Sequence, residues 1–327
     1  MANSASSRSG DNTAMERTPS CYKMPRNIRI YDSRGVEVAG VEQLPNGVWT
    51  GNRLYRALDV CFVAPTVRWW LAGRDSGREV MRDNEPVAQG YYDVMSQGGP
   101  LQIENTATPF FERTITPVTS PQVLKSSLVA PLRLRDGKCV ITGRSPYAGR
   151  WTALQACHIV PLTHLELFNE HFSSLLLDDT FPEGQPLNSV QNGLILGCEF
   201  HAHFVKYDFS IDPDDGYRIV WFSSVIKSMA PHPEYVPGLR RADIPENQRV
   251  LDEVLRWHYT QAVLGNVRGA GVRWNDSWDE DLGGKFGRLD LSEKRWTDPE
   301  RKGFLESELG VRLYDIAHRR NAPMYAV

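Results

Sequence analysis

The chain has 327 residues, 37 Lys and Arg against 40 Asp and Glu, five cysteines and an apolar fraction of 41%. These values exclude a disordered chain and a small disulfide scaffold, because the apolar content supports a substantial core and the cysteines are odd in number without CxxC spacing. The near-neutral total also excludes a uniformly cationic surface, so a phosphate-binding region would have to be a local patch.

Targeting signals are the next feature to consider. The N-terminal segment lacks the apolar stretch of a signal peptide, and no run reaches the roughly 18 apolar residues of a membrane span. We therefore expect an intracellular protein, cytoplasmic or nuclear, with reduced thiols and no membrane partner. The sequence carries no signal that sets an oligomeric state.

The first third of the chain predicts a tail and a β-rich domain. Residues 1–25 are rich in Ser, Asn and Arg without hydrophobic periodicity, which is typical of a disordered tail. Residues 26–118 alternate apolar and polar side chains between turn signals, which predicts a strand meander, a short helix and further strands at 59–67 and 90–94. Residues 119–134 are expected to form a linker or helix.

The remainder predicts a mixed domain and a helical extension. Over 135–222 we expect two strands, at DGKCVITG and at WTALQACHIVP, an insert at 161–190, a turn, a short helix and a hairpin. Over 223–327 we expect helices at 247–264, ended by Gly265, and at 300–319. The fold class is therefore α+β.

Three residues in a fixed order carry the chemistry: His158 in CHIVP, Asn192 in QNGLIL and His201 in EFHAHF. Together with the preceding CVITG, this order resembles the HNH nuclease family, in particular its branch in fungal proteins, over about residues 135–222. The flanking segments IYDSRGVEVAG, GYYDV and LRWHYTQAVLGNVRGAG are similar to the companion regions of those proteins. The resemblance implies a ββα domain following an N-terminal β-rich domain, with C-terminal helices.

The resemblance also implies a mechanism. A divalent cation, Mg, Mn or Zn, would neutralise the scissile phosphate of a nucleic acid. His158 would be the general base, Asn192 would orient its imidazole through the side-chain carbonyl and hold the turn, and His201 would be a metal ligand.

Two positions depart from the family pattern. The helix of the family reads His-x-x-x-Asp, which puts both ligands on one face, but the last position here is Val205. Cys157 precedes the base, and its thiolate would suit zinc better than magnesium. Asp208 is a substitute oxygen ligand, so the predicted metal ligands are His201, Cys157 and Asp208.

Charge leaves an alternative open. Residues 131–160 hold five basic side chains and one acidic, which predicts either a phosphate-facing patch or a solvated edge, whereas residues 161–222 hold ten acidic side chains and two basic. This acidity, with Val205 and Cys157, favours the alternative of an HNH fold that no longer acts as a nuclease. It would serve as a binding module or as a biosynthetic enzyme of fungal secondary metabolism, with a small-molecule substrate in a pocket at His158.

Overall fold

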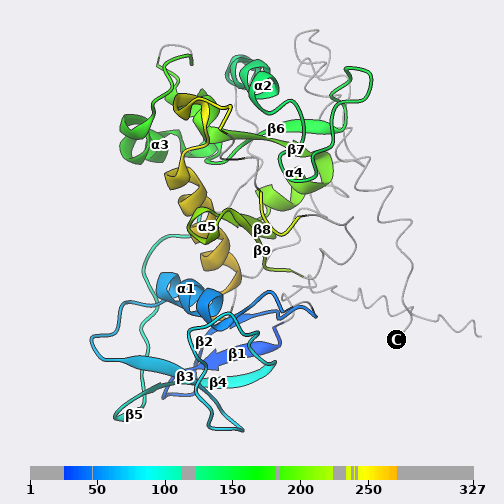
Figure 1. Cartoon of the computed structure of the whole chain (residues 1–327). Helices are drawn as coiled ribbons and strands as arrows, with labels where there is room; N and C mark the ends of the chain where they lie inside the picture. The colour runs from blue at the N-terminus through cyan, green and yellow to red at the C-terminus, as the bar shows by residue number, and fades with distance from the viewer. Residues whose placement is uncertain are drawn as a thin grey trace, which may run out of the picture. The chain divides into compact units, whose positions relative to one another are not determined.

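The computed structural model describes residues 26–45, 47–111, 122–181, 184–223, 233–236, 239 and 242–270 (Figure 1). All of them belong to one compact unit. The predicted tail at 1–25 and the last helix at 300–319 lie outside the described residues, as does most of the linker. The α+β class is confirmed, because a sheet precedes a smaller mixed region that ends in a helix.

The N-terminal part is a twisted sheet with one helix. Its order is β2-β1-β4-β3, with β5 added to β4, and β1 pairs antiparallel with β2 but parallel with β4. The elements are β1 (Ile28–Tyr31), β2 (Glu37–Val41), α1 (Gly51–Cys61), β3 (Trp69–Gly73), β4 (Gly90–Ser96) and β5 (Gly99–Pro100). Alternation in β1 buries Ile28 and Ile30 and exposes Arg29, as a half-buried strand requires.

Helix α1 begins at a position where close backbone packing requires a glycine. A Cβ at Gly51 would lie 1.9 Å from the backbone oxygen of Met81, so no larger residue fits this close approach. The predicted strand at 59–67 is wrong: residues 59–61 complete α1, Phe62 forms only an isolated bridge, and the next strand, β3, begins at Trp69.

The second part is built around a two-stranded sheet. Strands β6 (Leu154–His158) and β7 (Gly193–Gly197) pair antiparallel, and β7 leads directly into α4 (Cys198–Val205). The helices α2 (Gln122–Asp136) and α3 (Leu165–His171) also belong to this part, and α2 packs against β7. Residue 193 is a glycine because it lies against Leu132 of α2: an added Cβ would lie 2.7 Å from the Leu132 side chain.

The predicted strand at DGKCVITG is wrong. Residues 137–143 form a tight loop in which Gly137 and Gly143 adopt positive φ angles of 64° and 68°. The Cys139 thiol holds this loop against the sheet by accepting the backbone N–H groups of Thr142 and Gly197. The strand that pairs with β7 is therefore β6 alone.

A hairpin and a long helix complete the fold. The predicted hairpin is confirmed as β8 (Phe209–Asp212) and β9 (Arg218–Trp221), which pair antiparallel, and the predicted helix is confirmed as α5 (Asp252–Asn266). Gly265 lies inside α5 rather than after it. A Cβ at this position would approach the Phe110 ring to 2.7 Å, which explains why the residue is glycine. The fully buried His258 of α5 stacks on Phe204 of α4 and is hydrogen-bonded to Ser210 of β8, which fixes all three elements together.

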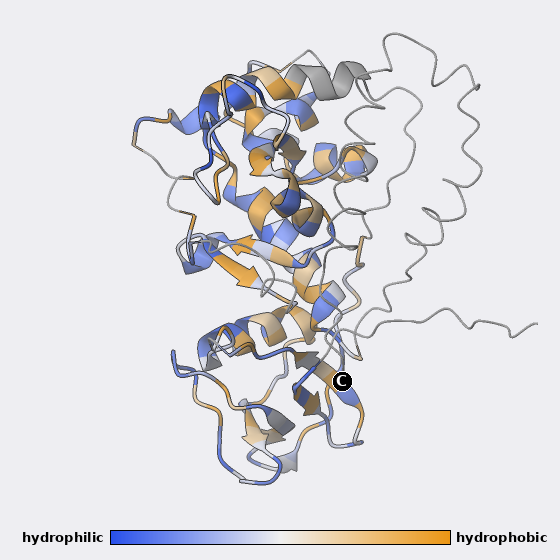
Figure 2. Cartoon of the chain, turned by 90° about the vertical axis from the view of Figure 1, so that its right-hand side faces the viewer, coloured by the Kyte–Doolittle hydropathy of each residue, from blue (hydrophilic) through white to orange (hydrophobic). Residues whose placement is uncertain are grey.

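The core of the second part is one continuous cluster. It joins apolar side chains of α2, β6, β7, α4, β8, β9 and α5. Figure 2 shows the corresponding pattern, with strands that are mostly apolar and helices in which polar and apolar residues alternate. Among the described residues, no helix has the length and apolarity needed to cross a bilayer.

Candidate active site

The ββα element brings the predicted site residues onto adjacent secondary structures. His158 is the last residue of β6 and pairs with Gly193 of β7, one residue after Asn192. His201 lies in the first turn and a half of α4, which follows β7 without a loop. Both histidine side chains are half-buried, so they line the surface rather than the core.

The His158 imidazole is held by an asparagine that the sequence does not single out. Nε2 of His158 lies 3.1 Å from Oδ1 of the buried Asn188, and Nδ2 of Asn188 donates to Oε1 of Gln185 at 2.9 Å. With the amide N–H of Asn188 directed to Gln185, Oδ1 of Asn188 faces the ring and accepts from Nε2–H in the tautomer protonated at Nε2. In the neutral ring, Nδ1 is then the basic nitrogen.

The Asn192 side chain makes one of its two predicted contacts: it holds the turn but does not contact the imidazole through its carbonyl. Its side chain is fully buried; Oδ1 accepts from the Val160 N–H at 2.9 Å, and Nδ2 donates to the carbonyls of Val160 at 3.1 Å and Leu187 at 3.0 Å. The expected contact between the Asn192 carbonyl and the imidazole is thus replaced by contacts to backbone. The expected hold on the turn is present, because these bonds tie the residues after β6 to the turn before β7.

That turn is built from two short 3-10 segments, Pro186–Asn188 and Val190–Asn192. Asp178 caps the second one, accepting from the Ser189 hydroxyl at 2.7 Å and from the Val190 N–H at 3.1 Å. Burial acts to raise the pKa of Asp178, but these bonds and those from Thr180 outweigh it, so the pKa lies below its usual value. The ionised carboxylate therefore stabilises the turn that carries both asparagines.

A buried ion pair holds the same turn from its other side. Arg135 donates to both carboxylate oxygens of Asp136, to the carbonyl of Val190 at 2.5 Å and to that of Gly193 at 2.7 Å. Asp136 in turn accepts the N–H of Ile195 in β7 at 2.9 Å. Arg135 is consequently a structural clamp, which removes it from the predicted set of phosphate-facing cations.

The predicted metal ligands are not brought together. Asp208 accepts from Nδ1 of His203 at 2.7 Å, so the substitute carboxylate is engaged by the histidine that faces away from His201. Cys157 pairs with Leu194 in the ladder and is 2% exposed in the core, whereas the next residue, His158, points to the opposite face of the strand. Val205, at the family's second helix position, is apolar and packs against the core.

These donors do not fit a divalent cation. Within the described ranges, no three His, Cys, Asp or Glu side chains form a group that could hold a metal ion. A buried thiol and a carboxylate already paired with imidazole are also poor ligands for an ion that prefers free oxygen donors.

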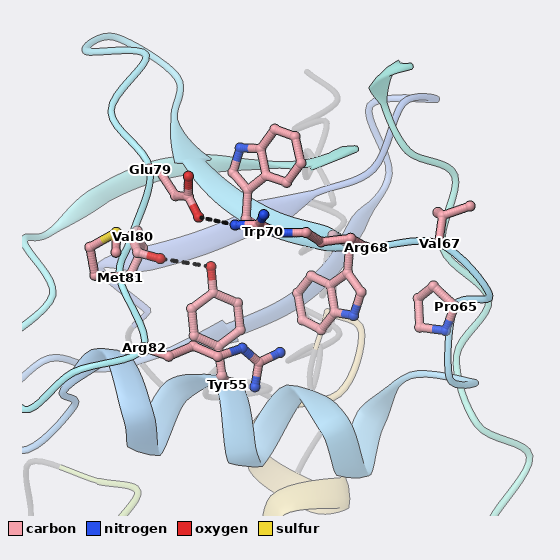
Figure 3. Close-up of a pocket in the computed structure, with 10 residues that line it drawn as sticks. Tyr55, Pro65, Val67, Arg68, Trp70, Glu79, Val80, Met81 and Arg82 are labelled. Carbon is pink, nitrogen blue, oxygen red and sulfur yellow. Dashed lines mark hydrogen bonds and ion pairs between the residues drawn. The ribbon is translucent and has the colours of Figure 1, made fainter. Parts of the chain in front are cut away.

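A cavity of about 420 Å³ lies in the N-terminal sheet region (Figure 3). Tyr55 of α1, Trp69 of β3 and Arg82 contribute to its wall, with the Arg82 guanidinium 4.1 Å from the Tyr55 ring centre. None of the predicted catalytic residues lines it. The pocket at His158 expected for a small-molecule enzyme is therefore not this cavity.

Comparison with known proteins agrees with the geometry of the second part. Residues 139–212 match a family model described as HNH endonuclease, a stretch that contains β6, β7, α4 and β8. No curated protein and no solved structure matches the chain. The order His158, Asn192, His201 and the ββα element both fall inside the matched stretch, so residues 139–212 form a domain similar to HNH endonucleases.

Proposed function

We propose that the HNH domain hydrolyses phosphodiester bonds of nucleic acid, with His158 as the general base. The observation that carries this proposal is the contact of Nε2 of His158 with Asn188, whose amide is oriented by Gln185. The similarity of residues 139–212 to HNH endonucleases supports the substrate class.

The residues of this chain supply the activation of the attacking water. Nδ1 of His158 takes a proton from the water that attacks phosphorus, the P–O3′ bond breaks, and the leaving 3′ oxygen takes a proton from solvent. The imidazolium that forms is stabilised because Nε2–H already donates to the Asn188 carbonyl. Asn188 is a positioning residue in this scheme, since it acts through the ring. Asn192 keeps the backbone after His158 in place.

A plasmid-nicking assay tests the proposal. Nicking is measured with EDTA and with Mg, Mn, Ni or Zn ions, for the wild type and for His158→Ala. We expect His158→Ala to lower the rate at least ~100-fold, the usual contribution of a general base. The matched control is His171→Ala, which removes an exposed histidine of α3 and should leave the rate unchanged.

Asn188→Ala separates positioning from mere structure. Loss of the acceptor for Nε2–H frees the ring, so the nicking rate should fall, and Asn188→Asp, which keeps an oxygen acceptor, should recover part of that rate. A variant that only loosened the fold would not be rescued by the aspartate. Nicking by His158→Ala at the wild-type rate would contradict the assigned mechanism.

A second function is favoured by the metal-ligand geometry. If the domain binds nucleic acid without cutting it, the engaged Asp208 and the apolar Val205 are accounted for directly. The same preparation distinguishes the two, because a binding module shifts a labelled duplex but nicks no plasmid with any of the four ions.

A further inference from the structure

The stretch from the end of α2 to the start of β6 has an unusual charge balance, and we name residues 133–151 the basic segment. Its one acidic side chain, Asp136, is neutralised by the buried Arg135. The remaining charged side chains are all basic and all exposed: Arg133, Lys138, Arg144 and Arg150.

These four side chains differ from most other basic side chains of the described residues, which form ion pairs. In the N-terminal sheet region Arg74 pairs with Asp93 and Arg82 with Asp59, and in α5 Arg256 pairs with Asp214. The four cations of the basic segment make no ion pair with any residue that the structure describes. Four like charges within one short stretch repel one another, and a polyanion would relieve that repulsion.

Aromatic and apolar groups stand between the cations. The Arg133 guanidinium lies 4.8 Å from the ring centre of Trp151, which holds it flat against the surface. Tyr147 is 84% exposed and Leu134 is 89% exposed, so both side chains are available to a binding partner. Basic side chains interleaved with exposed rings are typical of a surface that contacts nucleic acid.

Backbone contacts turn the basic segment back on itself, and its end lies beside the HNH element. The Cys139 N–H donates to the Arg144 carbonyl at 2.9 Å, and Tyr147 and Arg150 form an isolated bridge. β6 begins three residues after Trp151, and Cys198 at the start of α4 donates its N–H to Ala153. At about 3.3 Å per residue, the four steps from Leu154 to His158 span ~13 Å.

We propose that the basic segment binds the phosphate backbone of duplex nucleic acid and so aligns it with His158. This inference rests on the proposed function and extends it by naming the binding surface. Because β6, ~13 Å long, leads from the basic segment to His158, the cations contact phosphates other than the one that reaches the base.

The salt dependence of duplex binding measures the contact directly. Affinity for a fluorescein-labelled 20-base-pair DNA is followed by anisotropy, with wild type compared with a variant combining Arg133→Ala, Lys138→Ala, Arg144→Ala and Arg150→Ala. Each phosphate contact adds about 0.9 to the slope of log affinity against log salt, so the variant should lose a slope of ~3.6. Wild type should then lose about 150-fold more affinity than the variant between 50 and 200 mM salt.

Single variants provide the matched control. Arg144→Ala removes one exposed charge of the basic segment and should reduce the slope by about 0.9. Arg78→Ala removes an equally exposed charge from the N-terminal sheet region and should not change it. None of the four cations donates a side-chain hydrogen bond within the described residues, so unchanged thermal unfolding is expected and checks the fold.

The outcomes separate this surface from the nuclease function. An unchanged salt slope in the combined variant, or equal effects of Arg144→Ala and Arg78→Ala, would overturn the binding surface even if plasmid is nicked. Binding that is preserved in His158→Ala and reduced in the combined variant supports the surface, whether or not cleavage occurs. Tighter binding of anionic phosphatidylserine vesicles than of duplex would assign the cations to a membrane partner and refute the proposal.

Discussion

Substitution of Asn192 by alanine separates a structural role from a catalytic one. The change removes three hydrogen bonds from a fully buried side chain and strands the Val160 N–H and the carbonyls of Val160 and Leu187. These backbone atoms belong to residues that are at most 2% exposed, so water cannot replace the amide. At about 1–3 kcal/mol for each buried group left unpaired, the three groups together predict a loss of ~3–9 kcal/mol.

Urea unfolding followed by tryptophan fluorescence measures this loss. His158→Ala is the control, because its half-exposed side chain should cost about 1 kcal/mol or less. Asn192→Asp keeps the acceptor for Val160 but places a carboxylate beside two carbonyls, so it should destabilise at least as much as alanine. If Asn192→Ala kept wild-type stability and lost only nicking, the backbone-holding role would be refuted and a direct catalytic role restored.

Two further predictions concern the supports of the same turn. Arg135→Met leaves the Asp136 carboxylate, 4% exposed, without its partner, so we expect a loss of about 3–5 kcal/mol in urea unfolding; adding Asp136→Leu should recover part of it, and no recovery would contradict a charge-burial origin. Asp178→Asn tests pH linkage: because the folded pKa of Asp178 lies below 3.8, its carboxylate stabilises the wild type above that pH and loses this effect as pH falls through the folded pKa. The stability difference between wild type and Asp178→Asn should thus be constant near neutrality and shrink in acid, and a difference that grew in acid would reverse the assigned sign.

The regular elements of this fold were predictable where one physical signal dominates. Alternation identified β1 and β4, and helical spacing identified α5, because each has one face in the core. The strand predicted at DGKCVITG failed because its β-forming Val140 and Ile141 lie between two glycines that adopt positive φ. The Cys139 thiol then takes backbone N–H groups that a strand would have paired.

The candidate site was predictable in its order but not in its contacts. His158, Asn192 and His201 could be placed on a strand, a turn and a helix from their surroundings. Asn188 could not, because its contact with His158 depends on two consecutive 3-10 turns, for which the local sequence has no periodic signal. Arg135 was equally hidden, since a buried arginine and a solvated one look the same in sequence.

The two halves of the HNH element differ in how strongly the surrounding structure determines them. On the base side, Asn188 holds the imidazole of His158, while Asn192 and the Asp178 cap hold the backbone around it. On the helix side, α4 ends at Val205, which is partly buried against the core, and the Asp208 carboxylate contacts His203. Packing of Val205 stabilises α4 by the same burial that excludes a ligand at this position. The proposed base and the proposed phosphate-binding cations therefore do not depend on a metal ligand set, which is why binding and cleavage must be measured separately.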